Sequence, residues 1–275
     1  MIDAGVYPAF SNLHKDGPVH PTNLSSIQER LEQPRRSLSP SRFTDADFLE
    51  FQVKDHEAQS HVIILKNILP LILGSSNVPE ASEILFTNIK SVPADNFTQL
   101  KPDIYDGVDP SNLDANIRNI LSRYIEPSKN SSCPCLPNAY IEVKGKNQSP
   151  QIGQYQALHD GLIGERAMLK IIQYANNDES PNNAAHTIAA IYHAGDALLT
   201  LYTMHAIQRN EHGEQERIGY RQTQLTGFKM DSRQDQWIAG ATTLRNAREW
   251  AREQHENAVT KAHDAIDPML DFGNG

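Results

Sequence analysis

Two charged residues in the segment YIEVKGK, Glu142 and Lys144, are spaced to act together. The segment has the apolar neighbours of a β-strand, and residues two apart on a strand emerge on one face while Val143 points to the other. Hydrolysis of a phosphodiester needs neutralised phosphate oxygens and an activated water, and a carboxylate-bound Mg²⁺ supplies both. The pair therefore favours a metal-dependent hydrolytic site in which Lys144 holds or activates the water.

A second metal ligand is expected from Asp103 in the segment KPDIYDG, at the end of a neighbouring predicted strand. The carbonyl oxygen of Val143 would supply a third. Asp106 replaces Asp103 in this set if the strand turns early, although strand alternation favours Asp103 by placing it on the same face as Tyr105. The competing interpretation of Glu142 and Lys144 is a solvated ion pair on an edge strand, which would contribute little.

The elements that must position these residues follow from hydrophobic periodicity and turn signals. The chain is expected to begin with a helix capped by Thr44 and Asp47 and ended by Pro70 and Gly74, followed by a strand over 83–89 and a short strand over 99–107. An inserted helix between Asp109 and Pro127 then leads to the strand of Glu142 and a long helix over 151–175. A hairpin around Gly195-Asp196, a third β-run and a helix from Gln234 to about Asp264 complete the order. This order predicts an α/β fold: a mixed central sheet flanked by helices, with an inserted helix, an antiparallel extension and a C-terminal helix.

Composition sets the outer limits of the chain. Residues 1–42 mix Pro, Ser, Asn and basic residues and predict a flexible segment, followed by one domain over 43–265 and a frayed tail over 266–275. A mean hydropathy of -0.54 and the lack of a long apolar run exclude a membrane span. No secretory signal is visible, so an intracellular location is expected, with nucleus and cytoplasm both open. The net charge of -9 argues against binding nucleic acid through many basic side chains, but not against contact through metal ions.

Pro102-Asp103 followed by Glu142-x-Lys144 resembles the signature of the PD-(D/E)XK nucleases, the restriction-endonuclease-like superfamily, whose core is a helix, three strands, a helix and a further strand. The chain is most similar to a fungal family of PD-(D/E)XK nuclease-like domains of unknown function. That similarity runs over roughly residues 42 to 260, through the segments KPDIYDG, PNAYIEVKG, QALHDGLIGERAM, AHTIAAIYHAG, TQLTGF and GATTLRNAREWA. The resemblance implies a restriction-endonuclease-like fold and a Mg²⁺ cofactor, with Mn²⁺ as a substitute.

The resemblance also implies two further site residues. Glu57 in the first helix matches an acidic residue that superfamily members place beside the metal, and Gln156 matches a glutamine that orients a phosphate. Gln154 replaces Gln156 if the register is shifted. The chain departs from the family pattern at His159, where an aromatic is usual, and at Glu165, where a small residue is usual.

Other charged groups have simpler explanations. His186, His193 and His205 lack the compact spacing of a metal site and are expected to be structural hydrogen-bonding residues. Arg245, Arg248 and Arg252 alternate with glutamates along the last helix, which predicts a solvated face of ion pairs.

Three hypotheses for function follow. The first is a Mg²⁺-dependent nuclease that hydrolyses phosphodiester bonds of DNA or RNA through Asp103, Glu142 and Lys144. The second is a catalytically inactive module of the same fold that binds nucleic acid or a protein partner. The third is an internal ion-pair network, which predicts that the three side chains do not converge on an open cleft.

Overall fold

The computed structural model describes residues 2–11, 18–39, 41–90, 100–209 and 218–266. Its centre is a sheet of seven strands in the order β1-β7-β6-β5-β4-β3-β2. The strands are β1 (Val6–Tyr7), β2 (Glu80–Ser82), β3 (Ile104–Val108), β4 (Cys135–Lys144), β5 (Ala185–His193), β6 (Leu198–Gln208) and β7 (Ile218–Lys229). Neighbours are antiparallel except for the parallel pairs β4 with β5 and β1 with β7. The expected mixed central sheet flanked by helices is confirmed at this level.

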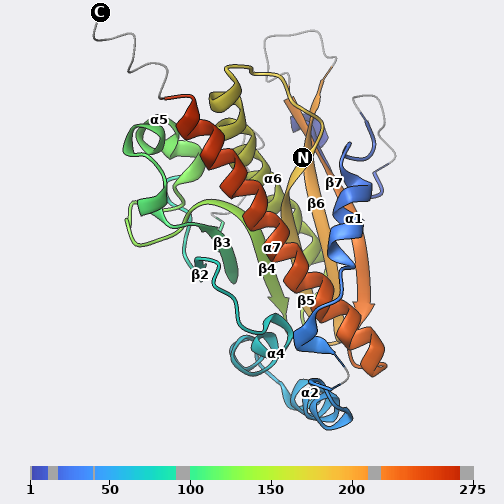
Figure 1. Ribbon diagram of the computed structural model, residues 1–275. Coiled ribbons are helices and arrows are strands. Elements are labelled where there is room, and N and C mark those ends of the chain that lie inside the picture. The colour runs from blue at the N-terminus through green and yellow to red at the C-terminus, as the bar shows by residue number, and fades with distance from the viewer. Residues whose placement is uncertain (1, 12–17, 40, 91–99, 210–217, 267–275) are drawn as a thin grey trace, which may run out of the picture.

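Two long helices cover the sheet from opposite faces. They are α6 (Pro150–Asn176), which connects the parallel strands β4 and β5, and α7 (Gln234–Asp264), which crosses the other face (Figure 1). The remaining helices are α1 (Leu24–Leu31), α2 (Asp45–Glu57), α3 (His61–Ile63), α4 (Leu69–Leu73) and α5 (Ala115–Ile125), with a π-helical turn η3 (Ile64–Ile68) and the 3-10 turns η1 (Ile2–Ala4), η2 (Arg36–Leu38) and η4 (Pro110–Asn112). Among the described residues, no helix has the length and apolar character to cross a membrane.

The two faces of the sheet enter separate hydrophobic cores. On the α7 side, β4 contributes Ile141 and Val143 to a core that also holds Trp237 of α7. On the α6 side, Tyr105 and Tyr140 pack with leucines of α6. Successive residues of a strand point to opposite faces of the sheet, so alternate residues of β4 enter the two cores. This alternation decides which charged residues of β3 and β4 meet which helix.

The first predicted helix is broken into several pieces. Thr44 and Asp47 form the expected capping box at the start of α2, but the chain leaves the helix at Ala58 and Ser60 caps a new turn. Pro70 does not end the helix. Because proline lacks an N–H and clashes with the carbonyl four residues earlier, the preceding turn widens to the π-helical η3, and α4 continues until Gly74.

The strand predicted over 83–89 is wrong. The strand β2 ends at Ser82, and Glu83 has a φ of 54°, a left-handed conformation that stops an extended ladder. The β-forming character of this segment instead reflects packing, because Phe86 is buried against Tyr105 and Tyr140. By contrast, the inserted helix, the long helix after the Lys144 strand, the hairpin at Gly195 and the closing helix form as predicted.

The N-terminal segment differs from its expectation. Within residues 1–42, β1 pairs with β7 at the edge of the sheet, and α1 packs against α7 with Ile27 and Leu31 buried. The side-chain amide of Asn23 exchanges hydrogen bonds with the backbone of Ala185, which fixes the start of α1 against β5. These contacts were not visible in the sequence because two strand residues and eight helix residues give almost no periodic signal. Residues 267–275 of the predicted tail lie outside the described residues.

Candidate active site

Glu142 and Lys144 emerge from β4 on the face covered by α6, together with Tyr140. Val143 points into the opposite core, as predicted from the strand period. β4 has β3 on one side and β5 on the other, so the two residues are not on an edge strand. They are also buried: Glu142 is 1% exposed and Lys144 is 3% exposed. The interpretation as a solvated edge pair is therefore wrong.

Asp103 lies immediately before β3 and is tied to β4 at two points. Its carboxylate oxygen Oδ2 accepts a hydrogen bond of 2.7 Å from the backbone N–H of Val143. Its own backbone N–H donates to Oε1 of Glu142 at 3.3 Å. The structure thus brings the two carboxylates to the same end of neighbouring strands.

The ammonium group of Lys144 lies between the three groups expected to hold a metal. Its Nζ is 2.7 Å from Oε2 of Glu142 and 3.8 Å from Oδ2 of Asp103. The same Nζ donates to the carbonyl oxygen of Val143 at 2.8 Å. Two carboxylate oxygens and one carbonyl oxygen therefore surround a single positive charge.

A fourth charged residue, Asp160 of α6, completes the group that we call the acid–lysine cluster: Asp103, Glu142, Lys144 and Asp160. The side chain of Asp160 is fully buried, and neither of its carboxylate oxygens has a hydrogen-bond partner among the described residues. Burial, together with the nearby Glu142 carboxylate, holds the pKa of Asp160 well above its ordinary value. Asp160 was not among the residues predicted for the site, although an acid inside the apolar stripe of a helix, in ALHDGLIG, was a usable signal.

The cluster contains more negative groups than positive ones. Burial raises the pKa of Glu142, with Lys144 opposing the shift and Asp103 reinforcing it. Such a group must gain either protons or a further cation to become neutral. Among the described residues no three His, Cys, Asp or Glu side chains are arranged as a ready metal site. The donor set of two carboxylates and one carbonyl nevertheless suits Mg²⁺, which binds few carboxylates and keeps several waters. Asp103, Glu142 and Val143 would hold it, with Lys144 displaced from the centre.

Asp103, the least buried member of the cluster, contacts His61, the first residue of α3. Nε2 of His61 lies 3.0 Å from Oδ2 of Asp103, and the His61 side chain is 32% exposed. Ser60 caps this turn by accepting a hydrogen bond from the N–H of Ile63. The break between α2 and α3 therefore places a histidine where the sequence predicted the acid Glu57.

Glu57 itself is exposed at the last position of α2. No contact joins it to the acid–lysine cluster among the described residues. Gln156 is placed more favourably: it is three residues after Gly153, whose backbone packs against Lys144, and four before Asp160. These spacings put Gln156 on the face of α6 that covers the cluster. Its side-chain oxygen is buried without a hydrogen-bond partner in the described part of the chain. Gln154, the replacement for Gln156, is exposed on another face of α6, where it lines a pocket together with Tyr202.

Asp106 is committed to another partner. Both of its oxygens accept hydrogen bonds of 2.7 Å from Arg248 of α7, and the same guanidinium donates to Glu80 at 2.6 Å. We call Asp106, Arg248 and Glu80 the arginine fork. The fork lies on the α7 side of the sheet, whereas the acid–lysine cluster lies on the α6 side. Asp106 is therefore not available as the ligand that would replace Asp103.

The predicted solvated arginine face holds only for Arg252, which pairs with Glu256 one turn later. Arg248 is 3% exposed. Arg245 donates to the carbonyl oxygens of Leu71 and Ile72, at the end of α4. The two arginines thus anchor β3 and α4 to α7.

The three histidines are separate structural residues, as expected. His186 contacts Glu165, His193 contacts the carbonyl oxygen of Gln148, and His205 contacts that of Pro18. Glu165 also accepts from the backbone N–H of His186 and so secures the start of β5. His159 is partly buried on α6.

Comparison of the chain with protein-family models, with curated proteins and with solved structures finds no match. The case for a function consequently depends on the residues and their geometry.

Proposed function

We propose that the protein is a metal-dependent hydrolase of nucleic-acid phosphodiester bonds, with Asp103, Glu142 and the carbonyl of Val143 as ligands of Mg²⁺ or Mn²⁺. The observation that carries the proposal is the position of the Lys144 Nζ, within 3.8 Å of one oxygen from each of these three residues. A cation is already the shared partner of the expected ligands. A bound divalent cation would neutralise phosphate charge and lower the pKa of a water.

Lys144 has the second role in the proposal. Once displaced from the oxygens of Glu142 and Val143, its ammonium keeps three N–H donors but loses its acceptors. It can then hold a water or a phosphate oxygen beside the carboxylates. Gly153 allows this movement, because a Cβ at this position would lie 3.2 Å from Cγ of Lys144. His61 is the neighbouring exposed group through which a substrate would first meet Asp103.

The order of elements supports the same proposal. The chain passes from the α2–α4 helical region through β2, β3 and β4, then through α6 to β5, with α5 inserted before β4. This order is compatible with the helix, three strands, helix and strand that the resemblance implies, and so it supports the proposal. The parallel pairing of β4 with β5 across α6 fits a mixed sheet of this kind.

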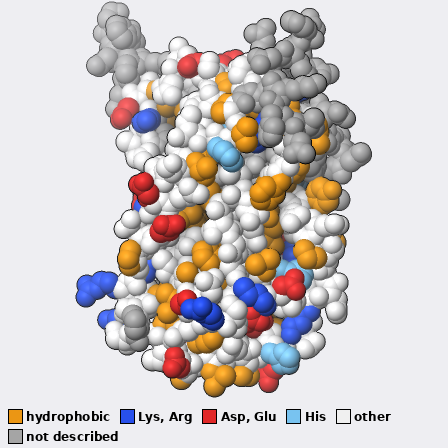
Figure 2. Space-filling view, turned by 90° about the vertical axis from the view of Figure 1, so that its right-hand side faces the viewer, with side chains coloured by type: hydrophobic (Ala, Val, Ile, Leu, Met, Phe, Trp, Pro, Cys, Tyr) orange, Lys and Arg blue, Asp and Glu red, His pale blue; other side chains and the backbone are white. Residues whose placement is uncertain are grey.

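Among the described residues, the face of the molecule in Figure 2 shows interspersed charges and no broad basic groove. In the view of Figure 2, lysine and arginine side chains are interspersed with acidic ones toward the lower end of the molecule, and the middle of this face is mostly uncharged. The chain as a whole has a net charge of -9. A substrate phosphate would therefore be held locally at the acid–lysine cluster.

Cleavage assays test the proposal directly. Labelled single- and double-stranded DNA and RNA are incubated with Mg²⁺, with Mn²⁺ or with a chelator, using the parent, Lys144→Ala and Lys144→Met. We expect metal-dependent cleavage that falls by at least about 100-fold in both variants. Lys101→Ala is the matched control, because Lys101 is half exposed and pairs with Glu83 at the surface. Equal cleavage by the parent and by folded Lys144→Met would refute the assigned roles.

A binding module without catalysis is the second candidate. The observation that favours a protein without catalysis is the burial of Glu142 and Lys144, which form a direct ion pair and are nearly inaccessible. This burial is also what the internal ion-pair network predicts. The binding module predicts no cleavage of any substrate with either metal, together with binding of a nucleic acid or a protein that Lys144→Met leaves unchanged. The same assays, followed by binding measurements on the uncleaved strands, separate the two candidates.

A further inference from the structure

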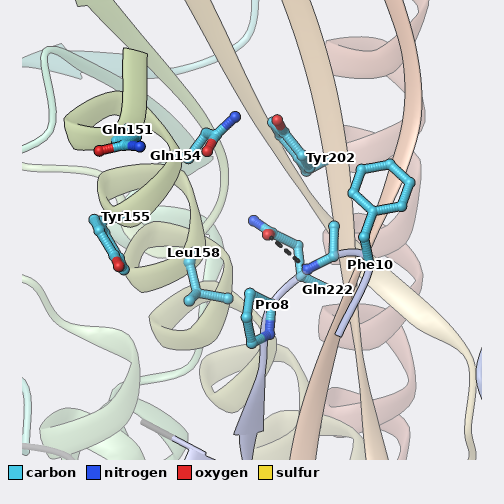
Figure 3. Close-up of a pocket in the computed structure, with 9 residues that line it drawn as sticks. Pro8, Phe10, Gln151, Gln154, Tyr155, Leu158, Tyr202 and Gln222 are labelled. Atoms are coloured by element: carbon cyan, nitrogen blue, oxygen red, sulfur yellow. Dashed lines mark hydrogen bonds between the residues drawn. The ribbon is translucent and has the colours of Figure 1, made fainter. Parts of the chain in front are cut away.

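A pocket of about 310 Å³ lies beside the start of α6, between that helix, the strands β6 and β7, and the segment that follows β1 (Figure 3). Nine residues line it: Pro8, Ala9, Phe10, Gln151, Gln154, Tyr155, Leu158, Tyr202 and Gln222. The volume is within the range of small-molecule sites in proteins. The proposed function assigns no role to these residues.

The lining of the pocket is uncharged and combines carboxamides with aromatic rings. None of the nine residues is charged, three are glutamines and three are aromatic. Carboxamides offer both hydrogen-bond donors and acceptors, whereas aromatic rings offer flat apolar faces. Tyr155 and Phe10 are 64% and 84% exposed, so both rings are accessible to a ligand. Such a lining favours a neutral, planar ligand with polar edges and does not favour a phosphate.

Gln222 gives independent evidence of a missing partner. Gln222 is 6% exposed. Its side-chain oxygen Oε1 accepts a hydrogen bond of 3.4 Å from the N–H of Ala9, whereas its Nε2 has no hydrogen-bond partner among the described residues. Figure 3 shows this amide nitrogen directed away from Ala9, toward the space between Gln154 and Tyr202. A buried donor without an acceptor destabilises the folded protein. A ligand carbonyl or ring nitrogen in the pocket would remove that penalty.

The backbone of Phe10 is a second feature that points to a ligand site. Its φ of 63° is in the left-handed region, which is uncommon for a residue with a side chain. The strained backbone holds a large apolar ring at the edge of the pocket, where it is almost fully exposed. Local strain of this type is concentrated at ligand sites.

We propose that this pocket binds one unpaired nucleobase. A base has a flat face for Tyr155 or Phe10 and an edge of donors and acceptors for Gln154 and Gln222, which is how proteins read unstacked bases. The identification of the ligand as part of a nucleic acid rests on the proposed function, since a base in this pocket belongs to the strand whose phosphate reaches the acid–lysine cluster.

The positions of the two sites agree with a common strand. α6 faces the cluster with Gly153 and Asp160 and faces the pocket with Gln154 and Leu158, on its opposite flank. Across the sheet, β4 carries the cluster and β6 carries Tyr202, with only β5 between them. Two strand spacings amount to roughly 10 Å. Bases of a duplex are stacked and paired, so the pocket would select single-stranded or flipped nucleotides.

Nucleoside binding tests the inference without relying on cleavage. The full chain, isotope-labelled, is titrated with adenosine, guanosine, cytidine or uridine, and with ribose 5-phosphate as a ligand that lacks a base. We expect at least one nucleoside, and not ribose 5-phosphate, to shift the side-chain amide signals of Gln154 and Gln222. Tyr155→Ala should weaken that binding at least fivefold, the lower end of base–aromatic stacking. Ile152→Ala is the control, since Ile152 is 51% exposed on the same helix but does not line the pocket.

Two results would overturn the inference: no shift with any nucleoside at its solubility limit, or equal binding by the parent, Tyr155→Ala and Gln222→Met. The same titration on Lys144→Met separates the two proposals. Nucleoside binding by both proteins without any cleavage would leave the pocket standing and refute the hydrolase. Cleavage without nucleoside binding would do the reverse.

Discussion

The strand β3 and the residue before it carry two buried aspartates that are treated in opposite ways. Asp106 faces α7 and receives two hydrogen bonds of 2.7 Å from Arg248, in the bidentate geometry that matches a carboxylate best. Asp103 faces α6 and shares one lysine with Glu142, while Asp160 nearby has no partner at all among the described residues. The arginine fork is a completed ion pair, and the acid–lysine cluster has three acids around one ammonium group.

The pairing of the acids distinguishes a structural group from a candidate functional group better than burial does, because the arginine fork and the acid–lysine cluster are both buried. Buried charges are retained when they are paired, and an unpaired acid lowers stability unless something else compensates it. The arginine fork has a structural role, because it links β3 to α7. The acid–lysine cluster has more acids than its single lysine can neutralise, and a bound cation or a proton from a substrate would neutralise the others.

The largest expected effect is on the fork. Arg248→Met leaves Asp106 buried without its partner and should lower the free energy of unfolding by about 3–5 kcal/mol. Denaturant unfolding measures this loss. Arg252→Met, which removes only a half-exposed pair with Glu256, should change it by less than about 1 kcal/mol. Similar losses in the two variants would contradict the distinction between a buried fork and a surface pair.

The second largest effect is expected for Asp160→Asn, which should raise the free energy of unfolding instead of lowering it. The pKa of Asp160 is raised above the ordinary value of 3.8, so the folded state holds its proton more tightly than the unfolded state. The resulting stabilisation is present at pH values below that ordinary value and is lost as the pH rises through the folded-state pKa. Asp160→Asn removes the ionisation and should make the protein more stable than the parent at pH 8, by on the order of 1–3 kcal/mol.

Thermal unfolding at several pH values in the presence of a chelator measures this effect. The stability of Asp160→Asn should vary less between pH 4 and pH 8 than that of the parent, since one titrating group is gone. Asp106→Asn is the matched comparison on the other face and should be destabilising, because Arg248 loses a charged partner. A destabilised Asp160→Asn at pH 8 would show that the acid has a partner in the folded protein.

The smallest effect is expected at Glu57, which belongs to neither charge group. Because Glu57 is exposed and has no contact with Asp103, Glu57→Gln should leave metal-dependent cleavage within about twofold of the parent. Asp103→Asn, measured in the same assay, should abolish it. A loss of ten-fold or more in Glu57→Gln would instead mean that α2 moves toward the cluster when the metal binds.

The sequence was informative where local periodicity and local chemistry agree. The alternation in YIEVKGK placed Glu142 and Lys144 on one face, and the long apolar stripes of α6 and α7 were clear enough to fix both helices. The contact between Asp103 and β4 was also anticipated, because Asp103 and Glu142 were expected at the ends of neighbouring strands in one sheet.

What the sequence did not reveal depends on contacts between distant segments. His61 approaches Asp103 only because α2 ends at Glu57 and a second turn begins at Ser60, a break that no glycine or proline announces. In the sequence, Arg248 looks like Arg252, which pairs with Glu256 at the surface, and only the position of β3 makes Arg248 a buried partner of Asp106. The specific fold within the mixed α/β class remains part of the proposal.

The pairing of β1 with β7 has a consequence for the order in which the molecule is built. Val6 is synthesised more than two hundred residues before its strand partner Tyr220. The elements that hold the acid–lysine cluster, from α2 to α6, are complete well before that point. Contacts of such long sequence separation form late and slowly. The wall formed by Pro8, Ala9 and Phe10 is therefore the last part of the nucleobase pocket to be added, so a nascent chain would acquire its charged centre before its means of recognising a base.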